Sequence, residues 1–321
     1  MASTHRGERR KMMNYHNPVL LNESIQQLIL NPSGIYVDVT FGGGGHSRKI
    51  METLDSEGRL IAFDQDADAL KDSIQDSRFQ FVPNNFRHLK KFIQYYKGFP
   101  ADGILADLGV SSYQFDTPER GFSHRFDGEL DMRMNKQKGI SAREVINGYP
   151  LQRLSDIFYT YGELSNGRRM AQQIVNEREK KEIATTGQLV EAVTPLLPRG
   201  KENKILSQLF QAIRIEVNDE MTVLKEFLSQ SAECLKPGGR LVIISYHSLE
   251  DRLVKNYIRS GNVEGKIEKD FFGNPLTPFK LITHKAIIPD ENEISANPRA
   301  RSAKLRVAEK KQFNQHQITE Q

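Results

Sequence analysis

The feature that most constrains the fold of this sequence is a regular alternation of short apolar runs with helix-like stretches. The runs are rich in β-branched and aromatic residues, and four of them predict strands, at 35–41, 59–64, 79–82 and 102–108. The stretches between them carry helical periodicity and predict helices at 47–54, 67–76 and 86–97. Strands that alternate with helices form a parallel sheet that is covered on both faces. We therefore predict an α/β fold.

The alternation is interrupted once, for about a hundred residues. From about residue 113 to about residue 218 no strand-like run occurs, and helical spacing predicts helices at 142–147, 151–161, 168–182, 186–197 and 205–217. A strand follows at 240–246, and runs at 279–284 and 303–307 suit an antiparallel edge pair. A chain of 321 residues is long enough for two domains. We predict an α/β domain built from 14–114 and 219–321, a helical insertion domain at 115–218 that recognises substrate, and a disordered basic tail at 1–13.

Composition excludes several classes of protein. A single cysteine, Cys234, rules out a disulfide framework, and the eight histidines lack ligand spacing, so we expect no metal site. No run of about 18 apolar residues predicts a transmembrane helix, and no apolar stretch follows the basic N-terminus as in a secretory signal. We expect a soluble, cytoplasmic protein with no membrane partner.

The net charge of +4 is unevenly distributed along the chain. Residues 1–16 carry +3 and residues 297–321 carry +4, so the body of the chain, 17–296, carries −3. Basic ends are typical of proteins that bind phosphate backbones, but solvated tails have the same composition. Both interpretations stay open on charge alone.

Four glycines, Gly42 to Gly45, follow the first predicted strand. Ligands of open parallel sheets bind at the carboxyl ends of the strands, where glycine lets a ligand approach the backbone; a tight turn is the alternative explanation. The run lacks the third glycine of a dinucleotide fingerprint and the Gly-Lys-Ser/Thr of a P-loop, which disfavours phosphorylated ligands. Asp64 ends the second strand, where its carboxylate can accept both hydroxyls of a ribose or cap the strand end. A nucleoside without phosphates fits best, which indicates S-adenosylmethionine.

Asp107 ends the fourth predicted strand, which we place beside the first. Its carboxylate can accept hydrogen bonds from an exocyclic amine, favour exposure of the nitrogen lone pair and take up the proton after methyl transfer. Capping of the following helix is the alternative role.

A dense polar segment, Ser245 to Arg252, follows the fifth strand. One interpretation is substrate binding, with Tyr246 or His247 on a base and Arg252 on a phosphate. The other is helix capping, with Ser248 as the N-cap. The sequence favours neither.

Eight motifs, taken in order, resemble the RsmH (MraW) family. They are His16–Leu21, Thr40–Ser47, Asp107–Ser112, Arg120–Phe122, Leu130–Met134, Phe210–Ile215, His247–Arg252 and Asn297–Arg306. The resemblance covers about residues 14 to 310. It implies a class I S-adenosylmethionine-dependent methyltransferase fold, which is Rossmann-like, with a mostly parallel sheet, an antiparallel edge strand and an inserted all-helical domain. It also implies methylation of the exocyclic N4 of a cytosine in the decoding region of 16S ribosomal RNA, within the small ribosomal subunit, and leaves a homodimer open.

Carried over position by position, the resemblance implies a site for the cofactor S-adenosylmethionine. Its residues are Gly44, Gly45, His46, Asp64, Phe86, Asp107 and Gln114, with Asp64 on the ribose, Phe86 beside the adenine, and Asp107 and Gln114 at the methionine end. The chemistry above makes Asp107 the first catalytic candidate, and His247 and Ser248 come second. The expected RNA-binding residues are Tyr246, Arg252, Arg299 and Arg301.

The chain departs from the family in a few places. Lys204–Ser207 replaces a common His-Pro-Ala, and Glu129 and Tyr246 stand where proline and phenylalanine are common. The irregular run 120–134 suits either a nucleic-acid cleft or a hinge between domains.

Two other functions stay open. The first is a methyltransferase that acts on DNA or protein, although the paired prolines of typical DNA amino-methyltransferases are missing after Asp107. The second is a non-catalytic RNA-binding or ribosome-assembly protein, although Asp107 and the glycines are intact.

Overall fold

A computed structural model describes residues 18–312, so the predicted tail at 1–13 lies outside the described residues. Seven strands form one sheet in the order β3-β2-β1-β4-β5-β7-β6. The strands are β1 (Ile35–Asp38), β2 (Arg59–Phe63), β3 (Phe79–Val82), β4 (Ala101–Asp107), β5 (Leu235–Ser245), β6 (Phe279–Leu281) and β7 (Lys304–Lys310). β1 to β5 run parallel, whereas β7 pairs antiparallel with both β5 and β6. This topology confirms the predicted fold class.

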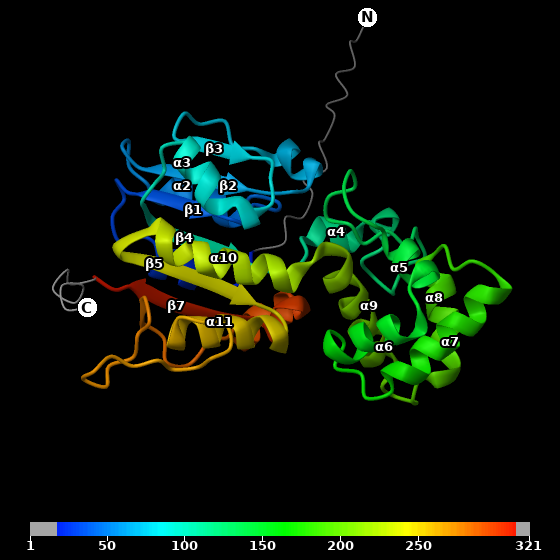
Figure 1. Ribbon diagram of the computed structural model, residues 1–321. Coiled ribbons are helices and arrows are strands. Elements are labelled where there is room, and N and C mark those ends of the chain that lie inside the picture. Colours follow the sequence, from blue (N-terminus) through cyan, green and yellow to red (C-terminus); the bar gives the residue numbers. More distant parts are fainter. Residues whose placement is uncertain (1–17, 313–321) are drawn as a thin grey trace, which may run out of the picture.

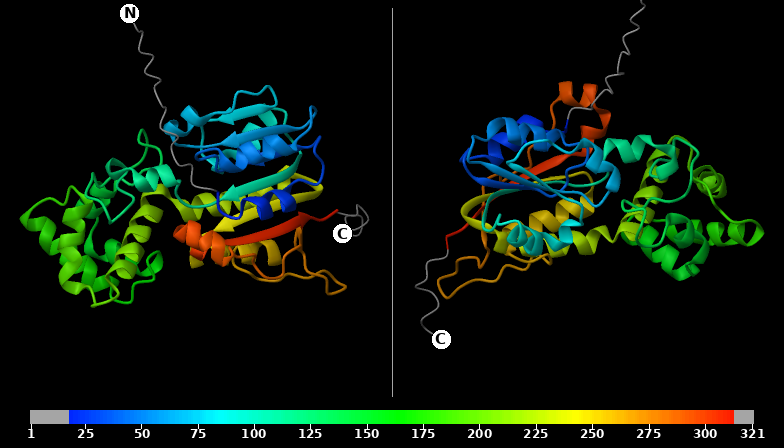
Figure 2. Two further views of the ribbon diagram at one scale, coloured as in Figure 1. Left: turned by 180° about the vertical axis from the view of Figure 1, so that it is seen from behind. Right: turned by 90° about the horizontal axis from the view of Figure 1, so that it is seen from above.

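Helices cover both faces of the sheet (Figures 1 and 2). One face packs against α1 (Leu21–Leu28) and α2 (Gly45–Thr53), and the other against α3 (Leu89–Tyr95), α10 (Glu220–Cys234) and α11 (Ser248–Ser260). The apolar strands are therefore buried on both sides, as their continuous apolar runs predict. None of the helices in the described part of the chain is both long and apolar enough to cross a membrane.

The named elements between β4 and β5 are all helices. Up to α9, this segment lies beyond the carboxyl ends of the parallel strands, and α10 then returns to the sheet (Figure 1). Its helices are α4 (Ser112–Asp116), α5 (Ala142–Gly148), α6 (Leu151–Thr160), α7 (Gly167–Lys180), α8 (Thr186–Val193) and α9 (Glu202–Asn218), with short turns η3 (Pro118–Arg120) and η4 (Thr194–Leu196). Capping boxes at Ser111, Ser141 and Thr185 start α4, α5 and α8 by satisfying their first N–H groups. The segment has an apolar cluster of its own, which includes Phe158 and Phe210.

Some predicted boundaries were wrong. The helix expected at 67–76 is a short 3₁₀ helix, η1 (Ala67–Asp72), in which Ala69 is the buried residue, so little apolar burial supports a longer helix. The helix expected at 86–97 begins with another 3₁₀ turn, η2 (Phe86–His88). β5 begins at Leu235 instead of at the predicted residue 240, and its pairing with β4 is irregular there. Past β6, the chain forms α12 (Glu291–Ala296) and η5 (Pro298–Ser302) before β7.

Candidate active site

The glycine run connects β1 to α2 at the switch point of the sheet, between β1 and β4. Gly42 and Gly44 have positive φ angles of 53° and 76°, which L side chains rarely adopt. A Cβ on Gly45 would lie 2.2 Å from the Pro18 Cγ atom. Turn geometry and packing therefore require glycine at these positions, whatever the loop binds.

Asp64 follows β2 and supports the glycine loop. Its two carboxylate oxygens accept hydrogen bonds from the Gly42 N–H (2.7 Å) and the Asp66 N–H (2.8 Å). Burial raises the pKa of Asp64 to about 6. Because each carboxylate oxygen has a second lone pair, the group can still accept ribose hydroxyls. Both roles weighed from the sequence are thus compatible with the structure.

Asp107 lies at the end of β4 and is held from three sides. The Tyr246 hydroxyl donates to its Oδ1 atom at 2.8 Å, and its backbone N–H donates to the Thr40 hydroxyl at 2.7 Å. Its Oδ2 atom lies 3.7 Å from the His46 Nδ1 atom. Burial raises the pKa of Asp107 to about 7. Ser111, not Asp107, caps the helix that follows.

His46 is buried in the first turn of α2. Its Nε2 atom lies 3.2 Å from the Val19 carbonyl oxygen, which assigns the ring proton to Nε2 and leaves the Nδ1 lone pair toward Asp107. Burial lowers the pKa of this imidazole. The neutral ring therefore adds no positive charge beside Asp107.

A cleft opens at the carboxyl ends of the parallel strands. Its lining comes from the loops after β1 to β4, from the loop before α5 and from α9 to α11. It consists of Thr40, Gln65, Asn85, Phe86, Leu108, Gly109, Met134, Asn218, Glu220, Met221, Val223, Leu224 and Glu250. These residues include two carboxylates and no basic side chain. A pyrophosphate would lack a cationic partner there, whereas a phosphate-free nucleoside that carries a positively charged sulfonium fits the lining.

Of the expected cofactor residues, Phe86 lines the cleft directly. Its ring packs edge-to-face on Phe227, with 5.4 Å between ring centroids. Asp64 and Asp107 each precede a lining residue, Gln65 and Leu108. Met134 and Asn218 were not among the expected cofactor residues; they come from the helical segment and meet the cleft only through the tertiary fold.

Gln114 is buried and lies in a polar cluster with Asp66 and Arg120. Its amide donates to the Asp66 Oδ2 atom at 2.7 Å, and the same oxygen accepts from the Arg120 Nη1 atom at 2.7 Å. The Gln114 Oε1 atom accepts the Ser111 N–H at 3.2 Å. Gln114 thus supports the loop after β2, and its expected place at the methionine end of the cofactor stays a prediction.

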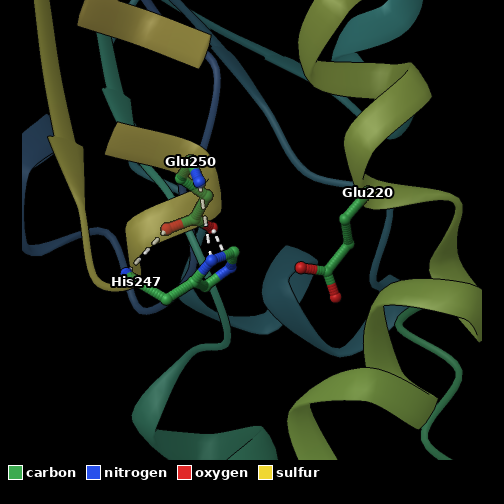
Figure 3. Close-up of side chains that lie close together, drawn as sticks. All are labelled: Glu220, His247 and Glu250. Carbon is green, nitrogen blue, oxygen red and sulfur yellow. Dashed lines mark hydrogen bonds and ion pairs between the residues drawn. The ribbon is translucent and has the colours of Figure 1, made fainter. Parts of the chain in front are cut away.

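His247 faces Glu250 and Glu220 across the start of α11 (Figure 3). The His247 Nε2 atom lies 3.1 Å from the Glu250 Oε1 atom, at an angle outside hydrogen-bond geometry. These three side chains offer one nitrogen and two carboxylates within 4.8 Å of one another. Arg214 donates to both oxygens of Glu220, at 2.9 and 3.1 Å. The charge of the Glu220 carboxylate is thus neutralised without a metal ion.

The cap of α11 was predicted wrongly. His247, and not Ser248, is the N-cap, since its Nδ1 atom accepts from the Glu250 N–H at 3.5 Å. Ser248 instead donates to the Glu163 Oε2 atom at 2.9 Å, and Arg252 lies 3.4 Å from the other oxygen of this carboxylate. The second-place catalytic candidates therefore contact Glu250 and Glu163, not Asp107.

The expected RNA-binding arginines have different surroundings. Arg252 keeps 62% of its side chain exposed. Arg299 pairs with Asp116 on α4 and stacks on Phe115, with its guanidinium 4.7 Å from the ring centroid. Arg301 is exposed in η5. Of these three arginines, Arg299 is the one that contacts both an acidic and an aromatic side chain of its own chain.

A sheet of this order, with a cleft at its switch point that lacks basic side chains, is the fold of a class I S-adenosylmethionine-dependent methyltransferase. The chain belongs to the MraW methylase family, whose model matches residues 13–311. The ribosomal RNA small subunit methyltransferase H of Bacteroides fragilis is 58% identical over 297 residues, which are 92% of this chain and 98% of that protein. The protein of the same name from Christiangramia forsetii is 58% identical over 93% of this chain and 99% of its own length. A solved rRNA methylase from Streptococcus thermophilus is 12% identical, with a TM-score of 0.39 over 91% of this chain and 93% of that one.

Proposed function

We propose that this enzyme transfers a methyl group from S-adenosylmethionine to the exocyclic N4 of a cytosine in the decoding region of 16S ribosomal RNA. The observation that carries the proposal is the cleft at the strand ends, which is lined by Glu220 and Glu250 and by no basic side chain. The names of the relatives, which are ribosomal RNA small subunit methyltransferases, support the choice of substrate. A cytoplasmic location follows from a ribosomal substrate.

The site residues fit the cofactor and divide its parts. Asp64 would accept the ribose hydroxyls, Phe86 would contact the adenine, and the glycine loop with His46 and Gln114 would border the methionine end. Bound S-adenosylmethionine supplies a methyl group on a positively charged sulfur, which becomes a neutral thioether as the carbon–nitrogen bond forms. The amine must then lose one proton.

Asp107 is the residue that we propose for that proton. Its ionised carboxylate can accept an N–H of the cytosine amine, which favours exposure of the nitrogen lone pair, and it can take up the released proton. The pKa of about 7 suits a group that exchanges a proton near neutral pH. His247 and Ser248 stay secondary candidates.

The RNA contacts belong to the same proposal. We propose that the helical segment at 115–218 and Tyr246, Arg252, Arg299 and Arg301 contact the ribosomal RNA, because they border the carboxyl edge of the sheet. We also propose that methyl transfer needs no metal ion and that the enzyme is a homodimer. Elemental analysis of the purified protein and light scattering test these two points; a stoichiometric metal or a mass near 36.7 kDa would contradict them.

Tritiated S-adenosylmethionine and small ribosomal subunits that lack the modification test the function. We expect label in 16S RNA and N4-methylcytidine in its nucleoside digest. Label at a ring carbon, or none in RNA, would overturn the proposal. Asp64→Ala should abolish cofactor binding in calorimetry, whereas unchanged affinity would refute the assigned ribose contact.

A further inference from the structure

We infer that Tyr246 is a positioning residue, whose hydroxyl orients the Asp107 carboxylate toward the amine of the substrate. The inference rests on the proposed function, since it concerns the same transfer. It gives Tyr246 a role other than the RNA contact expected from the sequence.

Tyr246 is fixed before any substrate binds. Its backbone N–H donates to the Glu250 Oε2 atom at 2.9 Å, which holds the residue between β5 and α11. Its ring lies beneath the loop after β4, where a Cβ on Gly109 would be 3.6 Å from the Tyr246 Cδ2 atom. The backbone hydrogen bond to Glu250 and the packing beside Gly109 therefore fix the ring from which the phenol oxygen reaches Asp107.

The hydrogen bond distinguishes the two oxygens of Asp107. Oδ1 accepts the Tyr246 hydroxyl at 2.8 Å, whereas Oδ2 lies 3.7 Å from the His46 Nδ1 atom, beyond hydrogen-bond distance. A carboxylate can rotate about its Cβ–Cγ bond, and the phenol restricts this rotation. Oδ2 is thus the oxygen left for an amine of the substrate.

The other charged groups around Asp107 work against ionisation. Glu250 on α11 and Asp38 at the end of β1 are acidic, and His46 on α2 is held neutral by burial. Burial itself raises the pKa of Asp107, and the Tyr246 hydrogen bond lowers it. Among the groups that act on Asp107, the hydroxyl of Tyr246 is therefore the one that stabilises the ionised form.

Tyr246→Phe removes only this hydroxyl. The pKa of Asp107 should then rise, so the acidic limb of the pH–rate profile should move to higher pH by about one unit. In single-turnover methylation of small subunits between pH 5.5 and 9, we expect the rate to fall roughly tenfold at pH 6 and to recover at pH 9. Cofactor affinity at pH 8 should stay within about twofold, because the phenol does not line the cleft.

Tyr36→Phe is the matched control. Tyr36 also donates its hydroxyl, to the Asn31 carbonyl oxygen at 2.9 Å, but at the opposite end of the sheet. The acidic limb of the pH–rate profile of Tyr36→Phe should match that of the wild type. A Tyr246→Phe rate that falls equally at every pH would show a merely structural role and overturn the inference. So would an unmoved limb.

Melting temperatures separate this inference from the proposed function. Without the Tyr246 hydroxyl, burial of the ionised Asp107 carboxylate costs more free energy. The melting temperature of Tyr246→Phe should therefore fall further below that of the wild type as the pH rises from 5 to 8. The deficit of Tyr36→Phe should not change. If the wild type methylates no RNA but this pattern appears, the function fails and the contact stands; a constant deficit refutes the contact.

Discussion

Asp107, the proposed proton acceptor, is buried by the fold at a cost in stability. Its carboxylate lies at a buried strand end, and burial raises its pKa to about 7 from an ordinary value of 3.8. Between these values the folded state binds the proton more tightly than the unfolded state does. The contribution of Asp107 to stability is therefore fully present below pH 3.8 and is lost as the pH rises through 7.

Asp107→Asn should stabilise the protein while it abolishes catalysis. The amide cannot ionise, so the cost of a buried charge disappears above pH 7, and the melting temperature at pH 8 should rise by about 2–4 °C for each kcal/mol relieved. The advantage should shrink toward pH 4, where Asp107 is neutral. Exposed Asp156→Asn is the control and should show no such trend. A pH-independent gain would mean that desolvation of Asp107 is not its source.

The sequence predicted where Asp107 lies but not what holds it. The carboxyl ends of parallel strands meet at one edge, so a carboxylate at the end of the fourth strand had to lie at that edge. Its contacts with His46 and Tyr246 join three distant segments. Their formation depends on ring orientations that periodicity does not encode.

At the scale of elements, the cluster of Asp66, Gln114 and Arg120 fastens the loop after β2 to the start of the helical segment. Arg120 is only 2% exposed and pairs with Asp66 at 2.7 Å. Its Nη2 atom also donates to the carbonyl oxygens of Arg133 and Met134, at 3.0 and 3.1 Å. The cluster therefore fixes Gln65, which lines the cleft, relative to Met134 from the other segment.

Arg120→Ala should destabilise the protein strongly, because it leaves the Asp66 carboxylate buried without its cation. We expect a loss of about 3–5 kcal/mol in the free energy of unfolding, measured by denaturant titration. Cofactor affinity should fall as well. Arg143→Ala removes a half-exposed pair with Glu182 and should cost no more than about 1 kcal/mol. Equal costs for the two variants would contradict the role of the cluster.

This cluster shows where sequence patterns stop being informative. The run 120–134 suited either a nucleic-acid cleft or a hinge, and the structure buries Arg120, Phe122, Leu130 and Met132 within it. A buried arginine and an exposed one look alike in sequence, since only the approach of Asp66 from β2 distinguishes them.

At the scale of the whole molecule, much of the basic C-terminal stretch is neutralised by the chain itself. Lys304 and Arg306 both pair with Asp251, at 3.2 and 2.6 Å, and Arg299 pairs with Asp116. Arg301 is exposed among them. Net charge is therefore a poor guide to which of these residues contacts RNA.

Arg301→Ala should weaken binding to the small ribosomal subunit and reduce the slope of log affinity against log salt by about 1. Arg301→Lys retains the charge and should restore the slope. Filter binding over a series of salt concentrations measures both. An unchanged slope for the alanine variant would remove Arg301 from the RNA interface.

The proposed division of the chain into two domains can be tested, because the helical segment and the sheet have separate apolar clusters. Phe158 on α6 is fully buried in the helical cluster, and Phe63 on β2 is fully buried in the sheet. Phe158→Ala should cost about 3–5 kcal/mol and accelerate hydrogen exchange in α5 to α9 but not in β1 to β5. Since most of the proposed cofactor contacts come from the sheet, S-adenosylhomocysteine affinity should stay within about twofold while methylation of the small subunit falls. Phe63→Ala is the counterpart in the sheet and should lose cofactor binding. If both variants lost cofactor binding to the same extent, the two apolar clusters would form one cooperative unit. The proposed domain boundaries at 115 and 218 would then be wrong.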